Sequence, residues 1–177
     1  MNMDDPRWPT AIHEAGHAVV SRAIGRPVRA VSIRPDEKTL GRVTHYPMPS
    51  FKPDAMINTR TRLRLEQMIM VYLGGVEAEK RVVHQADVES FAATDIDRAQ
   101  DLAFYMSNNE PDEAGAYLGW LQYRTRNLLN NPVWWAAVVG LADCLLIEEG
   151  MGGAQAYAAI QVAIDKYIAR YTEGAPS

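Results

Sequence analysis

Near the start of the chain stands the stretch Ile12-His13-Glu14-Ala15-Gly16-His17-Ala18, which contains an HExxH element. Residues four positions apart lie on one face of a helix, so His13 and His17 can direct two imidazole rings at one metal ion. Glu14 stands beside them, where a carboxylate can take a proton from a metal-bound water. Two ligands do not complete a site, so the chain must supply a third from elsewhere.

This element lies on a helix predicted over residues 9–24, which begins near Pro9 and Thr10 and ends before Gly25. Gly16 falls inside the apolar side of this helix, which is formed by Ile12, Val19, Val20 and Ala23. A glycine within a helix costs about 1 kcal/mol relative to alanine. Its presence predicts that another backbone packs closely against Gly16.

A β-hairpin and then a series of helices are predicted to follow. The runs 28–34 and 40–46 favour strands and flank a polar turn with Pro35. They predict a hairpin, with further pairing at its edge left open, and form the one clear strand region. Gly74-Gly75 marks either a break between helices or a site of tight packing. The predicted fold class is mainly α with one small β-sheet (α+β), with helices expected over residues 59–73, 94–107, 111–130, 133–148 and 154–171.

The size and composition indicate one globular domain. The chain has 177 residues, of which 47% are hydrophobic and 23% are charged, and this length suffices for a substantial core. We expect a single domain over residues 1–177, with flexible tails at 1–8 and 172–177. The aromatic residues of the C-terminal half are assigned to core packing, with an interface as the alternative: Trp120, Tyr123, Trp134 and Trp135.

Charge and hydropathy exclude several classes of protein. The net charge of −4 and the lack of a run rich in Lys and Arg argue against nucleic-acid binding. The polar, acidic start is unlike a signal peptide, and the most apolar run, 133–147, is shorter than the about 20 residues of a membrane span. Cys144 is the only cysteine and is interpreted as a buried apolar residue. We therefore expect a cytoplasmic protein without a membrane span, and the sequence has no phosphate-binding G-x-x-x-x-G-K-[ST] motif.

Several known arrangements could supply the third ligand. The extension H-x-x-G-x-x-H of one protease class is absent after His17. A glutamate from a later helix is another solution, which brings in Glu77 and Glu79 beyond the double glycine. Glu37 stands in the predicted hairpin turn and is interpreted as a solvated turn residue. The two remaining histidines are interpreted as surface residues of a strand and a loop: His45 and His84.

Asp95 is a further candidate because of its place on the predicted helix 94–107. It lies about 40° from the centre of the apolar face, whereas Asp97 lies on the opposite side. A carboxylate on the core side needs a partner, and a metal ion is one such partner. The alternative is that Thr94 caps the helix and Asp95 only favours its positive first turn. Geometry alone leaves both interpretations open.

Four blocks of sequence occur in the order found in a known family. They are His13 to Ala18, Val31 to Pro35 with Leu40 to Val43, Leu73 to Glu79, and Thr94 to Ala99. On these blocks the chain resembles the zinc-peptidase domain of the FtsH family of ATP-dependent metalloproteases, and the resemblance covers most of the chain. It implies an FtsH-peptidase-like helical domain with a zincin-like HExxH helix.

The resemblance also implies roles for individual residues. The aspartate of the fourth block is the third zinc ligand in that family, which implies a Zn²⁺ site of His13, His17 and Asp95. Glu14 would be the catalytic base. Glu79 becomes a candidate for holding a ligand histidine by its second ring nitrogen, with an ion-paired structural glutamate as the alternative.

The departures from the family pattern concern substrate handling. Thr94 stands where the family has Asn, and Phe91-Ala92-Ala93 replaces the usual Thr/Ser-Gly-Ala type of approach. The ATPase module and membrane spans of the family have no counterpart in this sequence. We therefore expect a zinc metallopeptidase that cuts peptides or unfolded chains without ATP, unless a separate ATPase delivers its substrate. The alternative is a non-catalytic, zinc-stabilised interaction module, and a homo-oligomer remains open.

The predicted hairpin also offers a place for substrate. An extended peptide can add as a strand to the edge of a sheet. Arg42, Thr44 and His45 would then line that edge, with an ordinary solvated strand face as the alternative.

Overall fold

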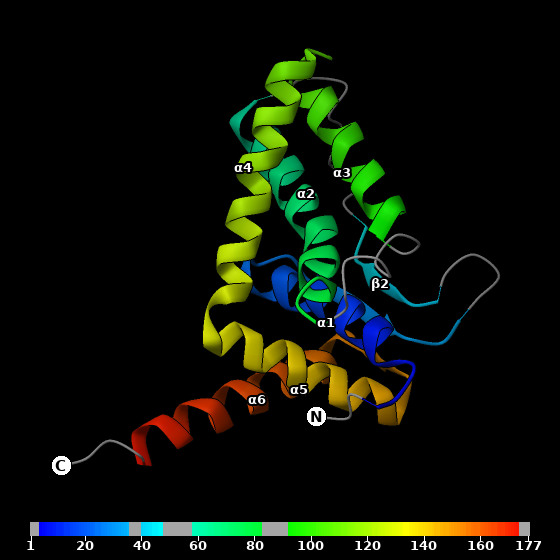
Figure 1. Cartoon of the computed structure of the whole chain (residues 1–177), viewed down its shortest axis with the longest axis vertical. Helices are drawn as coiled ribbons and strands as arrows, with labels where there is room; N and C mark the ends of the chain where they lie inside the picture. The colour runs from blue at the N-terminus through cyan, green and yellow to red at the C-terminus, as the bar shows by residue number, and fades with distance from the viewer. Residues whose placement is uncertain (1–3, 36–39, 48–57, 83–91, 174–177) are drawn as a thin grey trace.

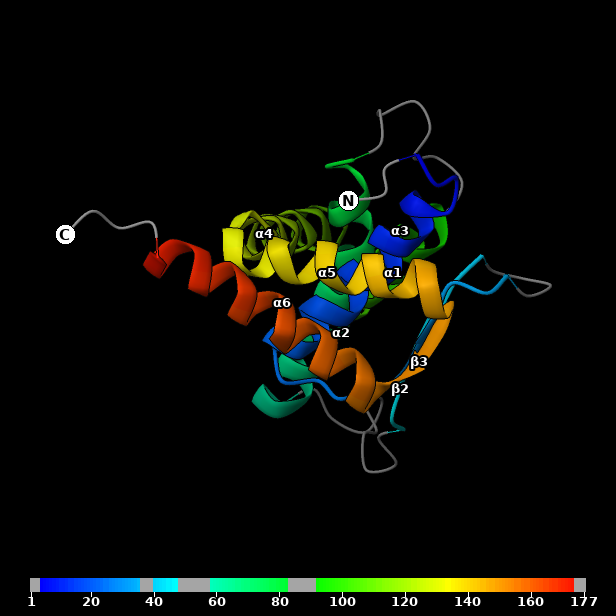
Figure 2. The same cartoon turned by 90° about the horizontal axis from the view of Figure 1, so that it is seen from below.

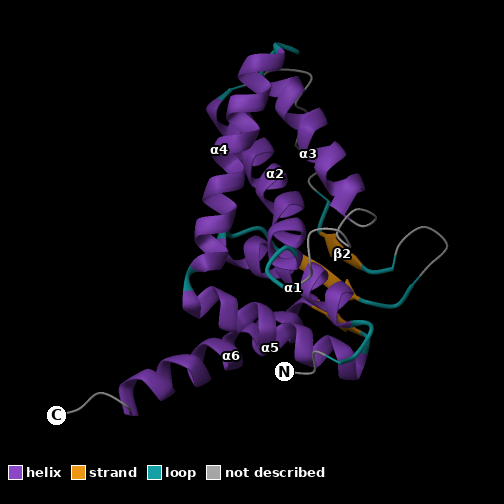
Figure 3. Cartoon of the chain, viewed as in Figure 1, coloured by secondary structure: helices purple, strands orange, loops and turns teal. Residues whose placement is uncertain are grey.

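The computed structural model describes residues 4–35, 40–47, 58–82 and 92–173. Helices dominate, and three short strands form one small sheet, as Figure 3 shows. The predicted fold class is therefore confirmed. The elements follow one another as α1 Trp8–Ala23, β1 Val28–Ser32, β2 Arg42–His45, α2 Thr59–Glu79, α3 Ala92–Met106, α4 Pro111–Asn130, α5 Pro132–Glu148, β3 Gly150–Gly152 and α6 Gly153–Glu173.

The sheet has the strand order β2-β1-β3, and both pairs are antiparallel. The predicted hairpin of β1 and β2 is confirmed. The further edge pairing comes from β3, a strand that the sequence did not indicate: it pairs with the other side of β1 and places Met151 opposite Val31. A Gly-Met-Gly segment has no alternating side-chain pattern, so its pairing comes from the partner strand rather than from its own propensity.

Helices α1 and α2 approach each other through glycines. A Cβ atom at Gly16 would lie 2.5 Å from the carbonyl oxygen of Gly74 and 2.6 Å from the Cβ of Ala78. The prediction of a closely packed backbone at Gly16 is confirmed. Helix α2 runs through Gly74-Gly75 without a break, so tight packing, rather than a helix boundary, accounts for the double glycine.

Helix α2 occupies the centre of the molecule. Helix α1 crosses it, α3 and α4 lie along its two sides, and α5 and α6 lie across one end (Figure 1). The view from that end shows α5 and α6 beside each other (Figure 2). One hydrophobic core links all six helices and strand β1, with fully buried members such as Ile12, Ile69, Leu121, Leu141 and Ile160.

The N-terminal segment and two aromatic residues differ from expectation. Trp8 begins α1 and is buried, and Arg7 pairs with Glu149, so this part of the predicted flexible tail is ordered by contacts. Residues 1–3 and 174–177 lie outside the described residues.

The assignment of Trp120 and Tyr123 to the core is wrong, since they are 47% and 65% exposed.

Among the described helices, none alone has the length and hydropathy of a membrane span. Helices α4 and α5 reach that level only when taken together, and they are bent by 79° relative to each other.

Candidate metal centre

His13 and His17 stand one turn apart on α1, on the side that faces α2 and α3. Both histidine side chains are buried, although histidine is polar. Their Nε2 atoms are 3.0 Å apart. The two buried nitrogens therefore face each other closely enough to share one partner, and a buried polar group needs a partner.

The other ring nitrogen of each histidine is held by α2. Nδ1 of His13 lies 2.9 Å from Oε2 of Glu79, and Nδ1 of His17 lies 2.6 Å from the carbonyl oxygen of Val71. An acceptor at Nδ1 places the proton there and leaves the lone pair on Nε2. Both rings therefore direct an unprotonated Nε2 toward the same point when a metal ion is bound there.

Asp95 reaches the same point from the first turn of α3. Its Oδ2 atom lies 3.1 Å from Nε2 of His13 and 3.0 Å from Nε2 of His17. Helix α3 begins at Ala92, so Thr94 lies within the first turn and does not cap the helix. Asp95 is buried and Asp97 is exposed, as the helix periodicity predicts. Asp95 thus faces the two histidines rather than solvent.

The three donor atoms fit a zinc ion. Zn²⁺ lies about 2.0–2.2 Å from nitrogen and carboxylate ligands, which places neighbouring ligand atoms of a tetrahedron about 3.3 Å apart. The three separations of 3.0, 3.0 and 3.1 Å are close to this value. Among the described residues, His13, His17 and Asp95 form the one cluster suited to a metal ion.

Gly75 keeps this position clear. A Cβ atom there would lie 2.5 Å from Nε2 of His17 and 2.8 Å from Nε2 of His13. Any larger residue would therefore enter the space in which the three donor atoms converge. The double glycine in the sequence indicates close packing at this position. Only the position of α1 shows that the atoms packed against Gly75 are the Nε2 atoms of the two histidines.

The protonation states follow from these contacts. Burial acts against the charged form of His13, but hydrogen bonds to Asp95 and Glu79 outweigh it and raise the pKa of His13 to about 10. Burial alone would raise the pKa of Asp95, yet His13 and His17 hold the pKa of this carboxyl well below its usual range. Without a metal ion the site therefore holds a proton on His13, and a metal ion must compete with it.

Glu14 is buried beside the histidines, under the segment that leads into β2. A Cβ atom at Gly41 would lie 2.6 Å from Oε1 of Glu14, so a glycine there lets the backbone cover this carboxylate. Burial raises the pKa of Glu14, and the neighbouring His17 and His13 oppose that rise. A carboxylate with a raised pKa is a better proton acceptor near neutral pH than an exposed one.

Comparison with known proteins places this geometry in a family. Residues 2–109, more than half of the chain, match the sequence profile of peptidase family M41. The chain belongs to peptidase family M41. The matched region contains α1, the hairpin, α2 and α3, which carry the whole cluster.

Several curated relatives are similar to this M41 chain. An ATP-dependent zinc metalloprotease FtsH of Magnetococcus marinus is 39% identical over 99 residues, which are 55% of this chain and 14% of the relative. The FtsH of Thermotoga maritima is 43% identical over 96 residues, or 52% of this chain and 14% of that protein. The aligned region thus spans about one seventh of the length of these relatives.

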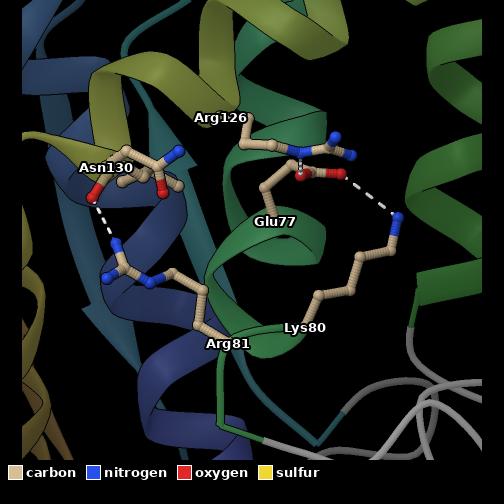
Figure 4. A pocket seen from close by; sticks show the side chains of 6 residues that line it. Glu77, Lys80, Arg81, Arg126 and Asn130 are labelled. Carbon is tan, nitrogen blue, oxygen red and sulfur yellow. Dashed lines mark hydrogen bonds and ion pairs between the residues drawn. The ribbon is translucent and has the colours of Figure 1, made fainter.

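The remaining candidates in the M41 chain lie away from the cluster. Glu77 is buried on another side of α2 and pairs with Lys80 at 3.1 Å and Arg126 at 2.8 Å. Figure 4 shows these side chains in a small pocket with Arg81 and Asn130. Glu77 is therefore an ion-paired structural residue.

Of His45, His84 and Glu37, the structure describes only His45. His45 is partly buried, and its Nε2 lies 2.9 Å from Oγ of Ser21 on α1, so its interpretation as a surface residue is wrong. Burial, together with the nearby Arg26 and His17, lowers the pKa of His45 to about 4. Glu37 and His84 lie outside the described residues.

Proposed function

We propose that this chain is a zinc-dependent endopeptidase that hydrolyses peptide bonds in peptides or unfolded polypeptides. His13, His17 and Asp95 would hold Zn²⁺, and Glu14 would be the catalytic base. The observation that carries the proposal is the convergence of three donor atoms within about 3 Å of one another beside a buried glutamate. Membership of a peptidase family and the zinc metalloprotease names of the relatives support it.

The residues of the chain would divide the reaction among them. A zinc ion bound at this cluster would supply a water whose pKa is lowered to about 7. Glu14 would accept a proton from that water and donate it to the leaving amine. Glu79 and the carbonyl of Val71 hold the two imidazole rings in the tautomer that leaves Nε2 available.

Strand β2 would bind the substrate. In the described sheet it pairs with β1 on one side only, so its other side can accept an added strand. Main-chain hydrogen bonds would align an extended peptide along Arg42, Thr44 and His45, independently of its side chains. Such binding suits a peptide or an unfolded chain, and the proposed reaction itself requires no ATP. A separate ATPase could unfold and deliver larger substrates.

The central experiment compares the wild type with Glu14→Gln. We expect about one bound zinc ion in both proteins, cleavage of casein by the wild type, and a fall in rate of about 10²-fold or more in the variant. Zinc is measured by atomic emission and cleavage by release of peptides. A wild type that binds zinc but cuts neither casein nor short peptides would support the non-catalytic module instead.

A second experiment tests the ligand assignment. Asp95→Ala removes one of three donors and should abolish stoichiometric zinc binding, whereas the exposed neighbour Asp97→Ala serves as the matched control. Retention of one zinc ion per chain by Asp95→Ala would overturn the assignment, and Glu79 would be the next candidate.

A further inference from the structure

The outer face of α4 carries a row of exposed residues. Trp120 and Tyr123 are 47% and 65% exposed, and Ala116 and Asn127 are exposed on the same side. Their spacing of four, three and four residues is that of a seam by which one helix packs against another. Helix α4 forms one outer edge of the molecule in Figure 1, on the side opposite α3.

Two glycines on this helix have no packing role within the described structure. A Cβ atom at Gly115 or Gly119 would meet no atom of the described residues within 4 Å. Each glycine in a helix costs about 1 kcal/mol relative to alanine. Nothing that the structure describes within the chain explains this cost. Gly119 borders the exposed row, so a second backbone packed on that row would account for this glycine.

The charges of α4 are separated along the helix. Asp112 and Glu113 stand in its first turn, and Arg124 stands near its other end, with its guanidinium 4.8 Å from the ring centre of Trp120. Glu113 and Arg124 are eleven residues apart, which is about three turns, so they lie on the same flank of the exposed face. The small residues Gly115 and Ala116 belong to the acidic half, and the aromatic residues belong to the basic half.

We propose that α4 pairs antiparallel with α4 of a second copy of this chain, about a two-fold axis near Leu118. Antiparallel packing reverses the order of residues and brings like flanks together. Glu113 then meets Arg124 of the second copy, and Ala116 meets Trp120 of the second copy. Ala116 thus receives the larger Trp120, and Glu113 receives Arg124, twice by symmetry.

The alternatives satisfy fewer of these features. Parallel pairing would set Glu113 against Glu113 and Arg124 against Arg124, and like charges in contact are destabilising. An unrelated acidic partner would match Arg124 but not Glu113. A second copy, placed antiparallel, uses both ends of the face and pairs the small residue Ala116 with the large residue Trp120.

The proposed contact leaves the metal centre free. The cluster is formed by α1 and α3 and lined by α2, whereas the paired face is the outer side of α4. A single helix from each copy buries less than the about 800 Å² per partner of a standard interface, so we expect a dissociation constant of about 10–100 µM. The dimer and the proposed peptidase activity are therefore independent and separately testable.

Charge exchange provides the decisive experiment. Sedimentation equilibrium of the full chain should show a monomer–dimer equilibrium. Glu113→Arg and Arg124→Glu should each weaken the dimer by about 10-fold or more, since each places two pairs of like charges in contact. In an equimolar mixture of the two variants, a heterodimer places an acid opposite a base in both pairs. It should be about as strong as the wild-type dimer.

Two further variants test the aromatic contact. Trp120→Ala should weaken the dimer about 10-fold, whereas Ile147→Ala on α5, which removes a 79% exposed side chain, should leave it unchanged. Circular dichroism must show that every variant remains helical. A wild type that stays monomeric up to about 1 mM, single charge variants that dimerise like the wild type, or a mixture that fails to recover would each overturn the proposal.

Discussion

Gly16 in α1 and Gly119 in α4 are the same residue in the interior of two long helices, yet their surroundings are opposite. At Gly16 a Cβ atom would collide with the backbone of Gly74, and at Gly119 it would meet no described atom within 4 Å. Both glycines carry the same propensity cost of about 1 kcal/mol. In α1 a helix contact inside the chain offsets this cost, and in α4 no described contact does.

The difference shows what close helix packing achieves in this chain. Because α1 and α2 meet through Gly16 and Gly74, α2 comes near enough to hold both histidines and to keep Gly75 beside their Nε2 atoms. The α4 face has the same small residues but faces outward. It is organised for contact with a second backbone from another copy.

Gly16→Ala should have the largest effect. The added methyl group would overlap backbone, which cannot move away as a flexible side chain can, so α1 and α2 must separate. We expect a loss of about 3 kcal/mol in the free energy of unfolding, measured by urea denaturation of the metal-free protein. A loss below about 0.5 kcal/mol would show that the contact is not tightly packed.

Glu79→Gln should weaken zinc binding by about 10–100-fold, because His13 loses a carboxylate acceptor at Nδ1. Zinc affinity is measured by competition with a chelator. The matched control is Glu77→Gln, two residues away on α2, which breaks pairs with Lys80 and Arg126 and should change stability but not zinc affinity. Equal effects of the two variants on zinc would contradict a specific role for Glu79.

Much of the α1 region could be predicted from the sequence. The HExxH spacing sets two histidines on one helix face, and Gly16 indicates a close helix neighbour. Asp95 is indicated by its position on the apolar side of α3, together with the resemblance to a peptidase family. Local periodicity fixes the direction of each side chain on its own helix, and the packing of the helices then brings Asp95 to the two histidines.

Other features depend on tertiary partners and could not be predicted. Glu77 and Glu79 look alike in the sequence, and only the positions of α1 and α4 decide which faces a histidine and which faces arginine. Strand β3 exists because β1 offers an edge to a glycine-rich segment. Trp120 and Tyr123 look like core residues by type, but their exposure depends on which side of α4 the other helices cover.

Gly119→Ala should have a smaller effect than Gly16→Ala and the opposite sign. A methyl group there meets open space in the described structure, so the gain in helix propensity should stabilise the monomer by about 0.5–1 kcal/mol. Urea denaturation at low protein concentration measures the monomer without interference from a dimer. Destabilisation comparable to that of Gly16→Ala would mean that the two glycines have the same role and would remove the contrast between the two regions.

The smallest effect is expected at His45, which contacts the margin of α1. Burial lowers its pKa to about 4 in the folded protein, against an ordinary value of 6.5. Between these values the unfolded chain binds more protons than the folded one, so stability falls as the pH drops from 6.5 toward 4. His45→Gln keeps a donor for Ser21 and removes this proton uptake, and comparison of the two proteins cancels the titration of other groups.

The variant should therefore lose less stability than the wild type between about pH 7 and pH 5, by about 0.5 kcal/mol, because solvent screens the partly exposed ring. Urea denaturation at the two pH values measures this difference. Ser21→Ala would remove the contact with His45 together with the hydrogen bond that the hydroxyl donates to the carbonyl oxygen of His17 at 2.7 Å. If His45→Gln and the wild type lose the same stability on acidification, the neutral ring is not held by the folded structure. The α1 margin would then be as open to solvent as the outer face of α4.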